Sequence, residues 1–513
     1  MNNCLRSTTS FAPTKAALVK SRKLPEKRNG ALNVLCLLTI PLLISGLVQE
    51  IFAAMDYAFF QDGAARSFAI PGTLTMLCAG LILKKNLKQI SSVKIHYRHA
   101  MLFVSLTWII CSVDSAIPIY LIENISFTDS VFEATSALTT TGATVLTNLD
   151  AKAPTLLMYR QFLQWLGGLG VVIFVVAIVP MLNVGGMRVF QAETPGPMKG
   201  DKLSPRIAKS ARALWIVYCW LTLSCALGYW LAGMNLFDAV AHSFSTVSTG
   251  GFSTHDASIG FFNSLAIELN ANIFMLLGAM SFGLHYRLLF RRQAASYFHD
   301  EEARVFVITI IVLTLLVAIV IIPETASATE KARAVSRAFF HVISFITSTG
   351  FGAGNFTEWP ATAVLLLIIA GYIGGCSGST AGGNKIVRDI IAIKIWLVQL
   401  KRLAHPRGLF VIKYNKTPID EGIRDATMAF LLLSIVLSAL FTLVLMASGL
   451  DFLTSFSAVS SCLNVLGPAF GELANNFIPL SDFSTWTLTF SMLLGRLEFF
   501  TLLVLFSPTF WRS

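Results

Sequence analysis

One pattern recurs as SALTTTG at residues 136–142, STVSTGG at 245–251, SFITSTG at 344–350 and SCLNVLG at 461–467. Each copy begins with serine and ends with glycine, and the side chain three positions before that glycine always carries a polar oxygen. The final glycines are 109, 99 and 117 residues apart. Self-similarity at such a spacing indicates four structural repeats.

Composition places these repeats in a membrane protein. Apolar residues make up 55% of the 513 residues and charged residues 13%, and the mean hydropathy is +0.68. A soluble domain carries roughly 25% charged residues, and a helix needs about 20 mostly apolar residues to cross a bilayer. Ten stretches meet that length: 32–55, 67–84, 101–122, 156–183, 211–234, 262–289, 304–323, 361–385, 425–449 and 484–508. We therefore predict an all-α integral membrane protein.

The content of lysine and arginine alternates from one link between spans to the next. The links after even-numbered spans are rich in both, and the other links are poorer, although Lys331, Arg333 and Arg337 weaken the contrast. By the positive-inside rule, the even-numbered links and both termini are cytoplasmic. The net charge of +11 is explained by this topology and does not by itself indicate nucleic-acid binding. The long basic start predicts a cytoplasmic tail followed by a retained helix rather than a cleaved signal.

Each pattern follows a short apolar segment on the side opposite the basic links. This order predicts four repeats of span, re-entrant pore helix, glycine loop and span around one central pore, preceded by two extra spans. The predicted divisions are a basic tail at 1–31, two extra helices at 32–98, and repeats at 99–185, 186–292, 293–416 and 417–513. The second and third repeats include cytoplasmic links.

Glycine loops at membrane depth indicate an ion path. Unpaired carbonyls there cost several kcal/mol per group unless protein or water satisfies them. Four loops that converge on one axis can replace the water shell of a dehydrated cation with carbonyl oxygens, as potassium-channel filters do. Glycine reaches the backbone angles required, and each short helix aims its negative C-terminal end at the cation. We expect a potassium pathway with no cofactor besides the transported ion.

Longer stretches carry a family resemblance: LTTTGAT at 138–144, YRQFLQWLGGLG at 159–170, GGMRVFQAETPGP at 185–197, GGFSTHDASIG at 250–260, IGGCSGSTAGGNK at 373–385, LNVLGPAFG at 463–471 and GRLEFFTLLVLFSPTFW at 495–511. From about residue 32 to its end, the sequence resembles the Trk/Ktr/HKT superfamily of cation transporters, and within it the bacterial Trk-type membrane subunit. The resemblance implies potassium uptake across the inner membrane, a homodimer, and a soluble cytoplasmic nucleotide-binding subunit that controls the gate.

The resemblance also implies that the four loop glycines line one selectivity filter. Members that prefer sodium commonly carry serine in the first loop, where this chain has Gly142. The fourth loop departs most from the others, with Val465 and Leu466 where threonines could stand, which predicts a lopsided site. The predicted potassium-binding residues are Thr140, Thr141, Gly142, Thr249, Gly250, Gly251, Thr349, Gly350, Phe351, Asn464, Val465, Leu466 and Gly467.

Five glycines interrupt the eighth predicted span, in GGCSGSTAGG at 374–383. Each interior glycine costs a helix about 1 kcal/mol relative to alanine, so the stretch predicts a broken helix. The alternative is a continuous helix whose small residues allow close packing. The resemblance implies an intramembrane gating loop beneath the filter, with Ala381 where relatives often carry glycine. The predicted gating residues are Gly374, Gly375, Cys376, Ser377, Gly378, Ser379, Thr380, Ala381, Gly382, Gly383, Lys385 and Arg496.

Two charges lie inside the last apolar span, where charge is costly and usually faces the protein interior or water. Arg496 and Glu498 either pair with each other or with neighbouring helices, or Arg496 lies at the pore and opposes cation passage, as the resemblance favours. Lys385 either acts with it or is merely the first cytoplasmic charge. His242 and His341 precede the loops, and we expect them to pack or hydrogen-bond rather than bind an ion.

Other function classes lack their signatures. The sequence contains no GxxxxGK[ST], HExxH or GxSxG motif, and its cysteines are scattered singly, so we expect neither an enzyme nor a metal site. A secondary transporter would usually show two inverted halves, whereas four parallel repeats favour a channel-like transporter. Coupling to sodium or protons, or weak selectivity between sodium and potassium, remains the alternative.

Overall fold

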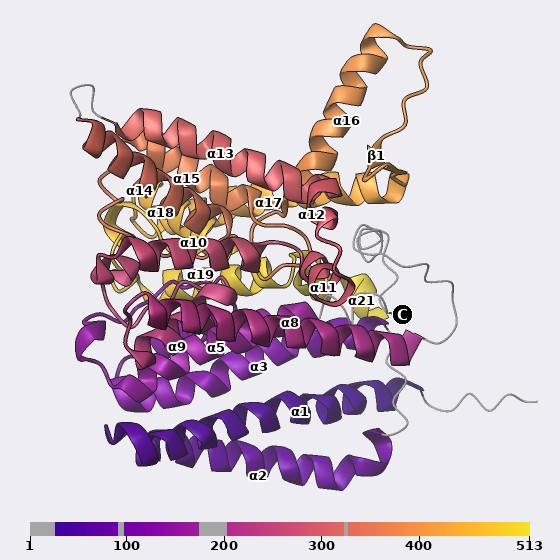
Figure 1. The fold of residues 1–513 in the computed structure, drawn as a ribbon. Helices are drawn as coiled ribbons and strands as arrows, with labels where there is room; N and C mark the ends of the chain where they lie inside the picture. The colour runs from indigo at the N-terminus through magenta and orange to yellow at the C-terminus, as the bar shows by residue number, and fades with distance from the viewer. Residues whose placement is uncertain (1–25, 91–96, 174–202, 323–326, 513) are drawn as a thin grey trace, which may run out of the picture.

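The computed structural model describes residues 26–90, 97–173, 203–322 and 327–512 (Figure 1). In these ranges the regular secondary structure is helical, with one hairpin of two-residue strands, β1 (Lys413–Tyr414) and β2 (Thr417–Pro418). The long helices are α1 (Glu26–Met55), α2 (Ala65–Ile90), α3 (Tyr97–Glu123), α5 (Pro154–Ile173), α8 (Leu203–Leu231), α10 (Leu265–Ala279), α13 (Glu301–Ile321), α14 (Ala328–Ile346), α15 (Ala361–Ile373), α16 (Ile386–Ala404), α17 (Glu421–Ala447) and α19 (Asp482–Arg496). The shorter ones are η1 (Asp56–Phe60), α4 (Phe127–Leu138), η2 (Leu149–Ala151), α9 (Leu236–Val247), η5 (Ser258–Phe262), α11 (Phe282–Arg291), α12 (Ala295–His299), α18 (Phe452–Leu463), η6 (Gly471–Leu473), α20 (Phe500–Leu503), η7 (Val504–Phe506) and α21 (Pro508–Arg512).

Six described helices are long and apolar enough to cross a membrane, and two bent helix pairs bring the number to eight if each pair is one span. The six cover the first, second, third, fifth, seventh and ninth predicted stretches. The fourth is α5 as far as Ile173, and residues 174–183 lie outside the described chain, as do the tail at 1–25 and the stretch at 185–197. The eighth stretch is α15 and α16 with a non-helical segment between them.

Two predicted continuous spans are sharply bent, which corrects the sequence interpretation. The span predicted at 262–289 is α10 followed by α11 at an angle of 98°, and the span predicted at 484–508 bends by 109° after α19. At the second bend Glu498 and Phe499 have left-handed backbone angles, with φ of 55° and 45°. At the first bend, backbone carbonyls freed from the helix are bonded by amides about one hundred residues later in the chain, which the local pattern does not reveal.

Four helices, α4, α9, α14 and α18, precede the glycine patterns, and each begins at a side-chain cap; we call them the short helices, although α14 has 19 residues. Ser126 caps α4, Asn235 caps α9, Ser327 caps α14 and Asp451 caps α18, each by accepting a hydrogen bond from a backbone amide of the first turn. Such caps satisfy amides that a helix start leaves unpaired. The last turns of all four helices are buried. The helices therefore start at the surface and end inside the protein.

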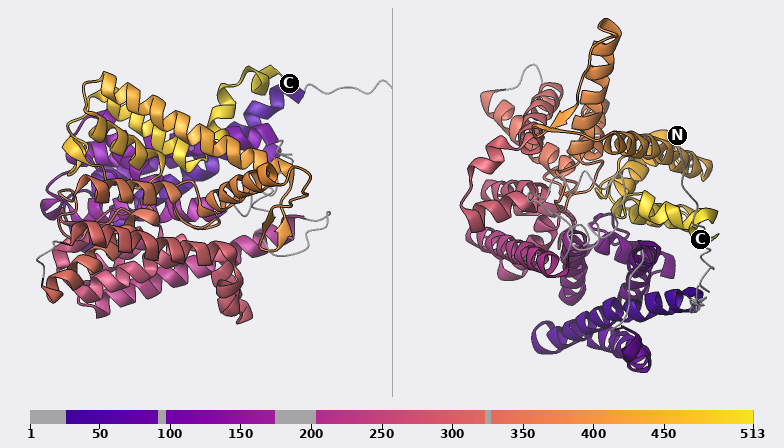
Figure 2. Two further views of the ribbon diagram at one scale, coloured as in Figure 1. Left: turned by 90° about the horizontal axis from the view of Figure 1, so that it is seen from above. Right: turned by 90° about the vertical axis from the view of Figure 1, so that its right-hand side faces the viewer.

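The helical units close a ring, which is visible end-on in the right-hand view of Figure 2. Each short helix packs against the spans of its own unit and against one neighbouring unit. The contacts between units are α4 with α19, α5 with α9, α10 with α14 and α15 with α18. Helices α1 and α2 pack on each other and on α3 outside this ring (Figures 1 and 2).

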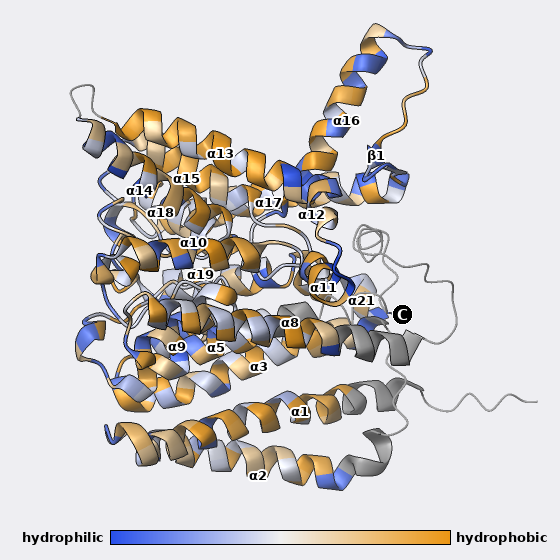
Figure 3. Cartoon of the chain, in the orientation of Figure 1, coloured by the Kyte–Doolittle hydropathy of each residue, from blue (hydrophilic) through white to orange (hydrophobic). Residues whose placement is uncertain are grey.

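The polarity of the protein is that of a membrane protein. The outer helices are mostly hydrophobic (Figure 3), and apolar side chains such as Leu223, Ile319 and Leu443 are more than 60% exposed. Serines, threonines and several charged groups are instead buried around the ends of the four short helices. Apolar side chains thus face outward, and polar side chains are gathered where the loops meet.

Candidate functional site

The four glycine patterns share one backbone conformation. Two positions before the final glycine, Thr140, Thr249, Ser348 and Val465 all have φ between 51° and 58°, and the four glycines have φ between 78° and 102°. In every loop the amide just before that glycine donates to the carbonyl of the first serine at 2.8 Å. Left-handed angles are costly for β-branched residues, and strain of this kind concentrates at functional sites. The fourth loop therefore turns as the others do despite its different side chains.

Side chains around the loops alternate instead of repeating four times. In the first loop the hydroxyls of Thr139 and Thr141 lie 2.8 Å apart, and Thr347 and Thr349 repeat this contact in the third loop. The second and fourth loops carry Gly250 and Leu466 in place of the second threonine. The side chains thus alternate in pairs while the backbone turn is the same in all four loops, and the lopsided site expected from the fourth loop stays a prediction.

Each loop glycine lies against a carbonyl of the next loop. A Cβ atom added to Gly142 would collide with the carbonyl oxygen of Gly250, and one on Gly251 with that of Thr349. The same holds for Gly350 against Leu466, and for Gly467 against Thr141. The four contacts run from the first loop round to the fourth and back, so the loops form a closed ring into which only glycine fits.

A cavity of about 240 Å³ adjoins this ring. It is lined by the four final glycines and by residues of the chain segments that lead away from them. At its rim His255 hydrogen-bonds to Asp150, and this bond holds the pKa of the Asp150 carboxyl below its usual value. In the described part of the chain no three His, Cys, Asp or Glu residues are grouped to hold a metal ion. The carbonyl oxygens of Thr141, Gly250, Thr349 and Leu466 are the backbone groups that lie against the four loop glycines.

Span α5 supports the first two loops. Gln164 donates from Nε2 to the carbonyl of Gly250 at 2.5 Å, and its Oε1 accepts from the amide of Phe252 at 3.2 Å. Arg160 donates from Nε to Glu133 at 2.7 Å, and both side chains are fully buried. Glu133 also accepts from the amide of Val145 at 2.9 Å. These hydrogen bonds hold the chain segments that lead into and out of the ring.

The histidines before the loops are hydrogen-bonded within the protein. His242 lies 2.9 Å from the Asp238 carbonyl and 2.8 Å from the Ser253 hydroxyl, through its two ring nitrogens. His341 lies 2.8 Å from the Arg337 carbonyl and 3.3 Å from the Ala353 amide. Both are completely buried. The prediction that these residues hydrogen-bond is confirmed.

The predicted break in the eighth span is present, and the alternative of a continuous helix is wrong. Helix α15 ends at Ile373, α16 begins at Ile386, and we call residues 374–385 the crossing segment. Gly374, Gly378 and Gly383 have φ between 70° and 74°. These left-handed angles explain why glycine is needed where the helix opens.

The crossing segment is bonded to the inner ends of the short helices. The Thr380 hydroxyl donates to the Val247 carbonyl at 3.1 Å, and the Gly383 amide donates to the Asn464 carbonyl at 3.1 Å. The amide of Gly382 bonds to the Ser348 hydroxyl. These partners belong to the second, third and fourth units. The segment therefore spans the ring at the helix ends, away from the cavity.

The bend between α10 and α11 is built around the same segment. The freed carbonyls of Gly278 and Ala279 accept from the amides of Thr380 at 3.2 Å and Cys376 at 2.8 Å. In return the Phe282 amide, at the start of α11, donates to the Gly378 carbonyl at 3.0 Å. The backbone groups left unpaired at one helix break are thus hydrogen-bonded to those at the other break.

Arg496 and Lys385 both bond to carbonyls of the crossing segment, of which Lys385 is the last residue. Arg496 donates to the carbonyl of Thr380 at 3.2 Å and to that of Gly167, in α5, at 2.9 Å. Lys385 bonds through Nζ to the Ala381 carbonyl. Glu498 does not pair with Arg496 as one interpretation allowed, because it binds Arg388 at 2.7 Å. The two predicted gating charges are therefore held against the segment itself.

Sequence reasoning missed several residues of the site. From the sequence alone, Arg160, Gln164 and Glu133 were given no role in the site. A charged or amide side chain within an apolar run is a signal that could have identified them. Glu302, at the start of α13, is buried and accepts from the Ser377 amide at 2.7 Å. Tyr414 of β1 lies 3.4 Å from the same carboxylate. No local pattern marks that link between the hairpin and the crossing segment.

Helical spans that expose hydrocarbon and surround four re-entrant glycine loops define a class of protein: an integral membrane protein of the ion-transport type. Comparison with known proteins agrees. The family model for the cation transport protein TrkH matches residues 69–513, and the chain belongs to this family. The prediction of an all-α membrane fold in the Trk-type family is confirmed.

Relatives cover nearly the whole chain. It is 42% identical over 456 residues to the Trk system potassium uptake protein TrkH of Halomonas elongata, which covers 88% of this chain and 94% of that one. It is 41% identical over 480 residues to the protein of the same name from Vibrio parahaemolyticus, with 92% and 98% covered. The crystal structure of the potassium transporter TrkH from Vibrio parahaemolyticus superposes with a TM-score of 0.85 at 37% identity and covers 94% of this chain and 100% of that one.

Proposed function

We propose that this protein takes up potassium ions across the inner membrane through the ring of four loops, and that residues 374–383 with Lys385 and Arg496 gate the path. The contact of each loop glycine with a carbonyl of the next loop carries the proposal. It brings backbone oxygens from four loops to one place, as a dehydrated cation requires. The names of the relatives, potassium uptake proteins, support potassium as the ion.

The direction of uptake follows from charge and potential. A membrane potential of about 100 mV, negative inside, contributes about 2.3 kcal/mol for each unit charge that enters. The proposed orientation, with both termini cytoplasmic, places the cavity outside and the crossing segment toward the cytoplasm. An entering cation then meets the ring first and the segment second.

A homodimer and a soluble nucleotide-binding subunit complete the proposal. The family resemblance suggests both, and the surface of α16 supports an interface. Trp396 and Leu403 on this helix are 62% and 80% exposed, and the helix projects beyond the ring in Figure 1. A large exposed apolar surface is typical of an interaction site.

The first test is rubidium uptake, with growth on limiting potassium, in cells stripped of their own potassium importers. Gly251→Ala should abolish rescue and lower uptake at least tenfold, because the added methyl meets the Thr349 carbonyl. Gly233→Ala is the matched control: Gly233 also has a positive φ, but open space surrounds its Cβ position. We expect it to keep most of the uptake.

Equal uptake by these two variants would remove the ring from the path. If the wild-type chain itself gives no rescue, the assay is repeated with the nucleotide-binding partner co-expressed and then with sodium in place of potassium. Rescue with the partner supports the regulated uptake proposed here, whereas transport of sodium alone would contradict potassium selectivity. Uptake that requires a sodium or proton gradient would favour the coupled alternative.

Selectivity tests the first loop separately. Gly142→Ser should weaken discrimination of potassium over sodium by about tenfold, equivalent to roughly 1.4 kcal/mol in relative affinity. The added side chain meets the Gly250 carbonyl and shifts one of the oxygens of the ring. Competition of sodium against rubidium uptake measures the effect. Unchanged discrimination in a folded variant would contradict a role for this loop.

A further inference from the structure

Helices α11 and α12 leave the bundle sideways. The angle of 98° between α10 and α11 turns α11 from the direction of a span to roughly that of the membrane plane. The left-hand view of Figure 2 shows this part of the chain extending outward beyond the neighbouring spans. On the proposed orientation, α11 lies at the cytoplasmic surface of the bilayer. A helix in that position contacts lipid headgroups on one side and acyl chains on the other.

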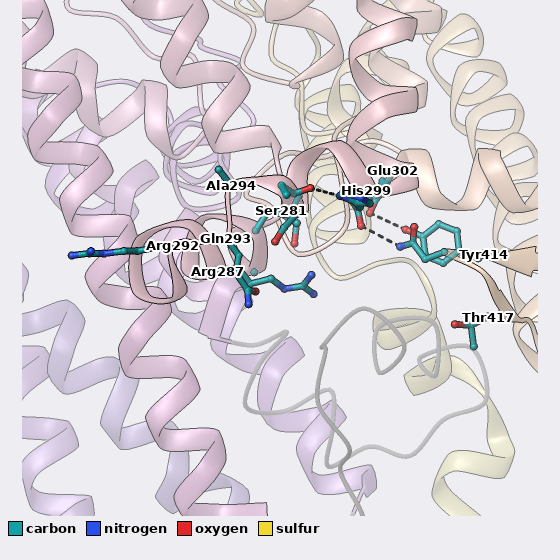
Figure 4. Close-up of a pocket in the computed structure, with 15 residues that line it drawn as sticks. Ser281, Arg287, Arg292, Gln293, Ala294, His299, Glu302, Tyr414 and Thr417 are labelled. Atoms are coloured by element: carbon teal, nitrogen blue, oxygen red, sulfur yellow. Dashed lines mark hydrogen bonds between the residues drawn. The ribbon is translucent and has the colours of Figure 1, made fainter.

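The residues of α11 suit that position. Arg287 and Arg291 are one turn apart, and Arg292 follows as the C-terminal cap. None of the three arginine side chains has an ion-pair partner among the described residues. Figure 4 shows Arg287 and Arg292 extending in different directions from α11, beside a cavity of about 750 Å³. The C-terminal end of α11 therefore carries three positive charges.

Apolar side chains flank these arginines. Leu288 and Leu289 are 39% and 40% exposed, Phe290 is 52% exposed, and Phe298 on α12 is 78% exposed. Tyr286 and Phe290 stack with ring centroids 5.0 Å apart. Exposed aromatic and aliphatic groups beside basic ones are typical of helices that lie in a membrane interface.

The elbow formed by α10, α11 and α12 is internally braced. His285 in α11 lies 2.7 Å from the Leu277 carbonyl of α10 and 2.5 Å from the Tyr297 hydroxyl of α12. The first amide of α11, that of Phe282, donates to Gly378 in the crossing segment. The start of α11 is thus joined to the crossing segment by a backbone hydrogen bond, and both Phe282 and His285 are buried.

We propose that α11 and α12 form a binding surface for anionic phospholipids of the cytoplasmic leaflet, with Arg287, Arg291 and Arg292 as headgroup ligands, and that lipid bound there sets the position of the crossing segment. The lipid-binding part stands on the geometry of the helix. The effect on flux rests on the proposed function. Basic residues near an anionic surface each contribute an attraction equivalent to roughly a fivefold change in binding, so three give on the order of a hundredfold.

The test uses the full chain purified in detergent, titrated with palmitoyl-oleoyl phosphatidylglycerol and followed by native mass spectrometry. Replacing all three arginines with glutamine (Arg287→Gln, Arg291→Gln, Arg292→Gln) should lower binding at least tenfold. A triple variant at the end of α2 (Lys84→Gln, Lys85→Gln, Lys88→Gln) removes the same charge from another helix and should bind as the wild type does. Phosphatidylcholine and inorganic phosphate at equal concentration should not compete.

A second arm measures rubidium flux in phosphatidylcholine vesicles that contain 0% or about 20% phosphatidylglycerol. Wild-type flux should change with phosphatidylglycerol, and the α11 variant should lose this response while the α2 variant keeps it. Equal lipid binding by the two triple variants would overturn the proposal, as would competition by inorganic phosphate. Loss of uptake in cells with lipid binding unchanged would assign the arginines to a protein partner instead. Absence of flux in every sample, with selective lipid binding intact, would contradict the proposed function and leave the lipid site standing.

Discussion

Arg496→Gln should raise basal rubidium flux in the absence of any regulator by about tenfold or more. The guanidinium donates to the Thr380 carbonyl of the crossing segment and to Gly167 of α5, so the variant frees one anchor of the segment. It also removes a buried positive charge from the proposed path. At an effective dielectric constant of about 20, a unit charge within about 10 Å of a passing cation costs it roughly 1.7 kcal/mol.

Arg496→Lys separates the two contributions. Lysine keeps the charge but cannot donate to both carbonyls from the planar fork of arginine. If repulsion dominates, the lysine variant should keep flux low, and if the anchor dominates, its flux should rise as in the glutamine variant. Arg424→Gln, which removes one charge from the exposed start of α17, is the control and should not change flux. A folded but inactive Arg496→Gln protein would contradict the gating role.

Features of this site that depend on short stretches of sequence could be predicted, because their causes are local. Caps such as Ser126 and Asp451 lie within three residues of the amides they satisfy. The opening of the helix between Ile373 and Ile386 follows from glycines inside that segment. The repeated loops were evident because serine and glycine stand at a constant spacing in all four.

The bend between α10 and α11 could not be predicted in the same way. Its unpaired carbonyls, those of Gly278 and Ala279, are satisfied by amides about one hundred residues later. The apolar run around residue 280 therefore has the sequence of an ordinary span. Only its contacts with the third unit reveal the bend. The contact of Glu302 with Ser377 and the pairing of Glu498 with Arg388 are likewise tertiary. Buried polar groups in membrane proteins indicate that partners exist, but only the fold identifies them.

The ion pair between Glu133 and Arg160 should be the most expensive contact to break. Both side chains are fully buried, and the guanidinium also lies 4.1 Å from the centre of the Phe252 ring. Removing one partner leaves an uncompensated buried charge, which costs about 3–5 kcal/mol. Glu133→Gln alone should therefore lower the midpoint of thermal unfolding in detergent by roughly 5–10 °C. Rubidium uptake should fall with it, because Glu133 holds the chain that follows Gly142.

A double-mutant cycle tests whether the loss comes from the pair or from each side chain alone. Glu133→Gln with Arg160→Met leaves no buried charge, so at least half of the lost stability should return. If instead the two single losses add, the residues act independently and the pair is not what holds the first loop. Recovery of stability without recovery of uptake would be the most informative result. It would mean that a neutral pair supports the fold, and that the charged pair sets the exact position of the loop carbonyls.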